Sequence, residues 1–216
     1  MNRGARLGAA GAVATGLLVA VTVVAGREGH VGRRPPDAAP LDLTVLGAQG
    51  AELADLLAKG RLQTFHATYR AASPDQPEAT IELWRKPPNQ RQDLVVSASG
   101  QVGRTASFVL RRASLSCVQE GPAPWTCQKV AAPPGAGPDA FLRLLVGEVS
   151  GPALDARDET IAGASARCFR FPLQAAIADV CATRSGVPAR ISHGSSSIEL
   201  TELTMSVPDR VFTPPA

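Results

Sequence analysis

The four cysteines are the residues whose type and spacing bear most directly on chemistry in this chain. They are Cys117, Cys127, Cys168 and Cys181, two local pairs spaced ten and thirteen positions apart. Structural zinc usually takes cysteines two to four residues apart, and the C-x-x-C motif of zinc and redox sites does not occur. Of the three possible pairings, the nearest-neighbour one is favoured because each pair brackets a turn. We therefore expect two structural disulfides, each stabilising the fold by roughly 3 kcal/mol, and no bound metal or cofactor.

Few other residues are placed to act as catalysts. The sequence has no G-x-S-x-G, no H-E-x-x-H and no glycine-rich phosphate loop. His30 lies in a Pro- and Gly-containing stretch, and His66 falls on the polar face of a predicted strand. His193 adjoins serines at a turn, where neighbouring side chains point apart. Glu199 and Glu202 are three positions apart and face opposite sides of a strand unless a bulge intervenes. The chain is therefore predicted not to be an enzyme.

The N-terminal segment has the pattern of an export signal. Arg3 and Arg6 precede an uncharged, largely apolar run over residues 7–26, and a positive flank before such a run is typical of a signal peptide or membrane anchor. Cleavage near Ala25 would release the protein, whereas retention would anchor it to the cytoplasmic membrane. No cysteine directly follows the run, so attachment through a lipid-modified N-terminal cysteine is not expected. Residues 1–26 are thus predicted to be a signal peptide or anchor of an extracytoplasmic, cell-envelope protein.

Composition limits the remaining function classes. Hydrophobic residues make up 44% of the chain and the net charge is +3, so the protein is globular and lacks the basic stripe that nucleic-acid binding requires. Residues 27–45 combine charge with Pro and Gly and are predicted to be an extended linker. Residues 46–216 remain as a single domain.

Hydrophobic periodicity indicates the elements of that domain. A stripe of leucines predicts an amphipathic helix over residues 46–62, ended by Gly60. "TFHATYRA" and "ATIELWRK" alternate apolar and polar residues and predict antiparallel strands with one solvated face. "AFLRLLVGEV" (residues 140–149) predicts a second helix, and "ETIAGASARCFRFPL" is interpreted as one strand. In total about nine or ten strands and two or three helices are expected. The fold class is therefore α+β: a large, curved antiparallel sheet, or half-barrel, with helices covering its concave face.

Two stretches carry a family resemblance. "FHATYRAASPDQPEATIELWRKPPNQRQDL" places an Arg-x-Pro-Pro element at the end of a strand, and "IELTELTMSVPDRVFTPP" forms a closing strand with a Pro-rich tail. Residues 46–216 thereby resemble the LolA-like superfamily, which implies a curved sheet around an apolar cavity. The resemblance implies binding of lipid or lipoprotein acyl chains outside the cytoplasmic membrane. The alternative is an RseB-like regulatory module that binds a membrane protein, for instance an anti-sigma factor.

A sheet too large for its helices to cover leaves apolar surface that needs a partner. The predicted cavity-lining residues are the apolar ones of the strands: Phe65, Ala67, Tyr69, Ile81, Leu83, Phe108, Leu110, Phe169 and Phe171. The plainer interpretation is that they pack against the helices as a closed core.

Overall fold

The computed structural model of the protein describes residue 43 and residues 46–98, 100–131, 148–173 and 176–215. The described residues of the N-terminal half form α2 (Gly47–Arg61), β1 (Phe65–Ser73), β2 (Gln76–Lys86), β3 (Asn89–Ala98), β4 (Gln101–Leu110), β5 (Ala113–Glu120) and β6 (Thr126–Lys129). Those of the C-terminal half form β7 (Asp155–Ile161), β8 (Ala164–Pro172), β9 (Ile177–Thr183), β10 (Pro188–His193), β11 (Ser196–Thr204) and the 3-10 helix η2 (Asp209–Phe212).

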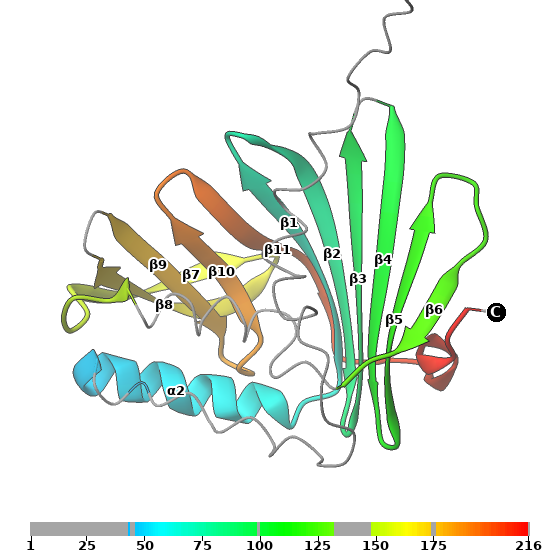
Figure 1. Ribbon diagram of the computed structural model, residues 1–216. Helices are drawn as coiled ribbons and strands as arrows, with labels where there is room; N and C mark the ends of the chain where they lie inside the picture. Colours follow the sequence, from blue (N-terminus) through cyan, green and yellow to red (C-terminus); the bar gives the residue numbers. More distant parts are fainter. Residues whose placement is uncertain (1–42, 44–45, 99, 132–147, 174–175, 216) are drawn as a thin grey trace, which may run out of the picture. The chain divides into compact units, whose positions relative to one another are not determined.

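The strands form one 11-stranded sheet in the order β6-β5-β4-β3-β2-β1-β11-β10-β9-β8-β7 (Figure 1). Every neighbouring pair is antiparallel. Strands consecutive in sequence are neighbours except β6 and β7, and β11 returns to pair with β1. The sheet is not closed, because β6 and β7 are its two edges. The predicted large antiparallel sheet is confirmed.

One of the predicted strands is in fact two. The stretch interpreted as a single strand around residues 159–173 folds as β7 and β8, which pair with each other. A two-residue turn at Ala162 and Gly163 joins them, with φ of 50° and 76°. Such turns usually carry Asn-Gly or Asp-Gly because both residues need positive φ. Alanine at the first position hides the turn from sequence inspection.

Cross-strand pairing shows which side chains share a face. On β1, Ala67 and Tyr69 point to one side of the sheet, and Thr68 and Arg70 to the other. From Thr68 the register runs through β2 to β6 along Glu82, Asp93, Ala106, Cys117 and Cys127. From Arg70 it runs through β11 to β7 along Glu199, Arg190, Cys181, Cys168 and Arg157. Both cysteine pairs therefore lie on the face of Thr68 and Arg70, which we call the disulfide face.

The opposite side is the helix face, because α2 packs against it. Buried leucines Leu53 and Leu57 of α2 share a core cluster with Phe169, Val180 and Ile191 of β8, β9 and β10. The predicted helix over residues 46–62 is thus confirmed. Among the described residues α2 is the single α-helix, so coverage of the sheet by two or three helices is not confirmed.

Two predicted apolar segments fall mainly outside the described residues. They are the helix at 140–149, of which 140–147 is not described, and the export segment at 7–26. Within the part of the chain that the structure describes, no helix is long and apolar enough to cross a membrane.

A contact between two glycines positions the end of α2. Gly60 is buried, and a Cβ added there would lie 2.0 Å from the carbonyl oxygen of Gly186. Gly186, at φ +88°, would place a Cβ 2.0 Å from the carbonyl oxygen of Leu56. Lys59 adds a hydrogen bond from its Nζ to the carbonyl oxygen of Arg184, at 2.9 Å. The prediction that Gly60 ends the helix is wrong by one residue; its role is to let the helix approach the β9–β10 turn.

The C-terminal segment packs against the disulfide face. Lys86 Nζ and Asp209 Oδ1 form an ion pair at 2.6 Å, and Arg91 Nη1 donates a hydrogen bond to the carbonyl oxygen of Val211 at 2.9 Å. Phe212, in η2, is buried. The segment that the sequence marks only as Pro-rich is therefore held to β2 and β3 by side chains.

Candidate functional site

The nine predicted lining residues do not share one face. Cross-strand rows place seven of them on the helix face: Phe65, Ala67, Tyr69, Ile81, Leu83, Phe169 and Phe171. Phe108 lies opposite Arg91, in a row that leads through Trp84 to His66. Phe108 and Leu110 therefore belong to the disulfide face, so the nine residues do not form one continuous lining. They pack there in a separate cluster with Cys117.

The helix face differs between its two ends. Over β8–β10 the apolar side chains are fully buried beneath α2. Over β2–β5 a strip of apolar side chains stays partly exposed, and its members are Ile81, Leu94, Val96 and Val118. Val118 on β5 is 42% exposed. We call these four residues the apolar strip.

Polar side chains flank the apolar strip on the same face. From Leu83 the register runs to Gln92, Ser107 and Ser116, all partly buried. The side-chain oxygen Oε1 of Gln92 is buried and accepts no hydrogen bond from the part of the chain that the structure describes. A buried acceptor without a donor is costly, so this position favours a donor supplied from elsewhere.

The disulfide face over β1–β4 carries a stack of rings and one guanidinium. His66 and Trp84 stack with centroids 4.8 Å apart. The guanidinium of Arg91 lies 4.9 Å from the Trp84 ring and 5.1 Å from the Phe108 ring. Its position is held by Asp93, whose carboxylate accepts hydrogen bonds at 2.8 Å and 2.5 Å. Because Arg91 also holds the C-terminal segment, this stack is a structural anchor.

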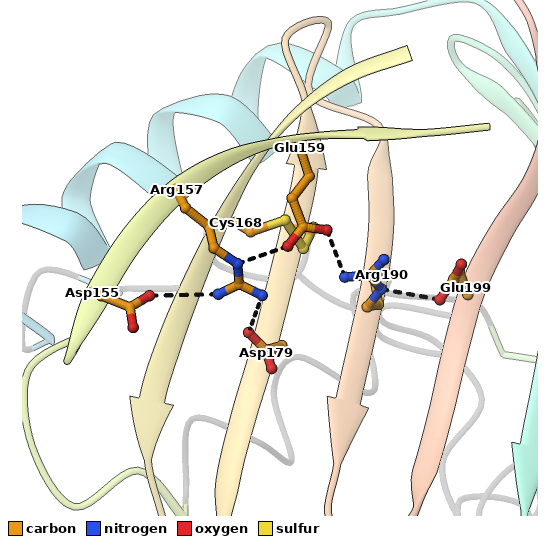
Figure 2. Close-up of a disulfide and its surroundings, with 8 residues drawn as sticks. Asp155, Arg157, Glu159, Cys168, Asp179, Arg190 and Glu199 are labelled. Atoms are coloured by element: carbon orange, nitrogen blue, oxygen red, sulfur yellow. Dashed lines mark hydrogen bonds and ion pairs between the residues drawn. A yellow bond between two sulfur atoms is a disulfide. The ribbon is translucent and has the colours of Figure 1, made fainter. Parts of the chain in front are cut away.

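A charged network surrounds the Cys168–Cys181 disulfide, on the same disulfide face (Figure 2). Arg157 on β7 contacts three carboxylates. Its Nε donates to Glu159 at 2.7 Å, and its Nη2 donates to Asp179 of β9 at 2.9 Å. Its Nη1 lies 3.4 Å from Asp155. One guanidinium thereby joins the edge strand to a strand two positions further into the sheet.

The network continues across two more strands. Glu159 accepts a second hydrogen bond from Arg190 Nη1 of β10 at 2.8 Å, and Arg190 Nε donates to Glu199 of β11 at 3.0 Å. Figure 2 shows these side chains lying around the Cys168–Cys181 bond. The network therefore links four strands across the face that carries this disulfide.

The pKa values of the network follow from its geometry. Burial alone would raise the pKa of Glu159, but the hydrogen bonds from Arg190 and Arg157 outweigh it, and the pKa is lowered. The hydrogen bond to Asp179 and then that to Glu159 raise the pKa of Arg157 against the effect of burial. Burial lowers the pKa of Arg190, but its hydrogen bonds to Glu159 and Glu199 have the larger effect, and the pKa is raised. Each charge is thus satisfied by its neighbours, which suits a structural role better than acid–base catalysis.

Both predicted disulfides are formed, Cys117 to Cys127 and Cys168 to Cys181. Each joins residues directly opposite one another on antiparallel strands. The Glu159 carboxylate and the two sulfurs of the second bridge lie within 4.8 Å of one another. A metal ion takes cysteine as a thiolate, and these sulfurs are bonded to each other.

Two features of this face are not apparent from sequence spacing. A register shift beside Thr68 brings Glu202 and Glu199 opposite Thr68 and Arg70, so the two glutamates share one face through the bulge that their spacing requires. The charged network has a weak local signal, the alternation of Asp155, Arg157 and Glu159 along one strand. Its partners on β9, β10 and β11 become neighbours only in the folded sheet.

Comparison with known proteins gives a likeness at the level of the fold. No family model and no curated protein matches the chain. The structure described as "The complex structure of Pseudomonas aeruginosa MucA/MucB" matches with a TM-score of 0.51 and 15% identity, over 77% of this chain and 61% of that chain. A second structure of MucB in complex with MucA(peri) matches with a TM-score of 0.43 and 16% identity, over 77% and 60%. A structure of PNGF-II matches with a TM-score of 0.37 and 12% identity, over 71% and 30%.

The chain spans about three fifths of the length of the chains it matches in the two MucB structures. At such low identity the likeness concerns the fold alone. The MucA/MucB structure at a TM-score of 0.51 thus supports, at the coarse level of an open antiparallel sheet, the architecture that the LolA-like resemblance implies.

Proposed function

We propose that this chain is an extracytoplasmic module that binds a membrane protein through the helix face over β2–β5. The observation that carries the proposal is the apolar strip, whose residues stay partly exposed while α2 completely buries their equivalents over β8–β10. Apolar side chains left accessible on a sheet mark an interaction surface. Two disulfides indicate an oxidising compartment.

Three observations favour a protein over a lipid as the partner. The polar side chains of Gln92, Ser107 and Ser116 flank the strip, and protein interfaces mix polar and apolar groups. The buried oxygen of Gln92 calls for a hydrogen-bond donor, which a peptide backbone has and an acyl chain lacks. A solved structure of similar fold is a complex of two proteins, MucA and MucB.

Acyl-chain binding is the second candidate. It rests on the same strip, since partly exposed Ile81, Leu94 and Val96 would also accommodate a lipid tail. Native mass spectrometry of the exported protein, purified without detergent, distinguishes the two: a co-purified acyl lipid supports the second candidate. The prediction that the protein is not an enzyme stands beside both.

The test uses a tagged full-length chain expressed in its own host and two variants. Leu94→Ser removes an apolar side chain from the strip, and Arg104→Ser changes an exposed residue on the disulfide face of β4. Both variants are checked for an unchanged melting temperature within a few degrees. We expect a membrane protein to be recovered with the wild type and with Arg104→Ser, and its recovery to fall about tenfold with Leu94→Ser, because an interface centre depends on few residues. Equal recovery with both variants would contradict this surface.

A further inference from the structure

The two disulfides differ sharply in how accessible they are. Cys168 and Cys181 are both 0% exposed, and their strands β8 and β9 are each paired on both sides. Cys117 is also 0% exposed, but its partner Cys127 lies on the edge strand β6, all four residues of which are exposed. The first bridge thus has one exposed residue at the edge of the sheet, whereas both residues of the second bridge are buried.

The charges near the two bridges reinforce this difference. The carboxylate of Glu159 and the sulfurs of the second bridge lie within 4.8 Å of one another. The network around this bridge holds four carboxylates against the guanidinium groups of Arg157, Arg190 and Arg170, so its net charge is negative and repels an approaching thiolate. Lys129 lies two residues after Cys127 on the same strand and is exposed, and it attracts a thiolate. The carbonyl oxygen of Pro215 is 3.8 Å from the Cys127 sulfur, and Cys127 is nevertheless exposed. Access and charge therefore both direct exchange to Cys127.

We propose that Cys117–Cys127 is a thiol-exchange site, attacked at Cys127 by a small thiol or dithiol, and that its reduction releases β6 from the sheet. The attacking thiolate bonds to the Cys127 sulfur, and Cys117 leaves as a thiolate that takes a proton from water. With a dithiol, the second thiolate then displaces Cys127 and closes a cyclic disulfide. Two electrons pass from the dithiol to the bridge.

Release of β6 follows from how little else holds it. The strand pairs with β5 alone, over four residue pairs, and none of its residues is buried. Reduction would expose the edge of β5, including Leu115, which packs beside Cys117 and Phe108. The bridge between β8 and β9 has no such consequence, because those strands are held by neighbours on both sides.

The test starts from the oxidised full-length chain with no denaturant. The chain is treated with dithiothreitol for increasing times, quenched in acid and alkylated, and the four cysteines are followed by peptide mass spectrometry. Cys117 and Cys127 are expected to become alkylated at least about tenfold faster than Cys168 and Cys181, because the buried bridge must wait for local opening. Equal rates, or the reverse order, would overturn the proposal.

Three further measurements test the direction of attack, the role of charge and the release of β6. With glutathione as a monothiol, the first mixed disulfide should form on Cys127 and the free thiol appear at Cys117; the opposite placement refutes the attack at Cys127.

Glu159→Gln should speed reduction of Cys168–Cys181 several-fold without changing the rate for Cys117–Cys127, and an unchanged rate for Cys168–Cys181 would refute the role of charge. Hydrogen exchange after selective reduction should increase over residues 126–129 and remain low over β8 and β9; retained protection at 126–129 would refute release of the strand.

Discussion

The two ends of the sheet use the same kinds of element to different effect. At the β7–β10 end, α2 buries one face, a four-strand ion network crosses the other, and the disulfide between β8 and β9 is inaccessible. At the β2–β6 end, the apolar strip remains partly exposed and the disulfide lies at an edge strand. The difference is consistent with the proposed function, in which the first end provides stability and the second keeps surface available for a partner. Substitutions at matched positions should separate the two roles.

The largest effect is expected where α2 seals the sheet. Phe169→Ala removes a fully buried ring from the cluster beneath the helix, and should lower the free energy of unfolding by about 4 kcal/mol. Leu94→Ala in the apolar strip, already partly exposed, should cost only about 1 kcal/mol. Urea denaturation of both variants measures the difference. Similar losses would mean that the β2–β5 end is as tightly packed as the β8–β10 end.

The glycine contact at the end of α2 should give the next largest effect. Gly186→Ala combines positive φ with a Cβ placed 2.0 Å from a backbone oxygen, and should destabilise by about 3 kcal/mol. Gly163→Ala is the matched control, since its φ is +76° but nothing lies within 4 Å of the added Cβ; it should cost about 1 kcal/mol. Thermal unfolding of both proteins provides the comparison. Equal melting temperatures would contradict the close approach of α2 to the β9–β10 turn.

Some of these features could be predicted from the sequence and others could not. Helix periodicity located α2, and cysteine spacing identified both disulfides. The turn at Ala162 escaped because alanine rarely adopts positive φ. The face of Phe108 could not be predicted because β4 carries apolar residues at both alternating positions, Phe108 and Val109. The pairing of Phe108 with Arg91, which also holds the C-terminal segment, decides that the Phe108 side chain, and not that of Val109, lies on the disulfide face.

The smallest predicted effect concerns the ion network and depends on pH. The pKa of Glu159 is lower in the folded protein than its ordinary value of 4.5, so its stabilising contribution is present above about pH 4.5 and is lost as the pH falls through the folded-state value. Glu159→Gln should therefore lower stability by about 1 kcal/mol near neutral pH, and the difference from wild type should shrink below about pH 4.5. Melting temperatures between about pH 3 and 7 measure it. A difference independent of pH would show that the carboxylate charge contributes nothing.

Photo-crosslinking in the native host can show whether the helix face over β2–β5 meets a protein partner. A benzophenone amino acid is placed either at Val118, in the apolar strip, or at Gln119, the next residue, which points to the disulfide face. We expect a crosslink from position 118 to one membrane protein and none from position 119. Crosslinks of equal yield at both positions, or an adduct with lipid alone at 118, would contradict it.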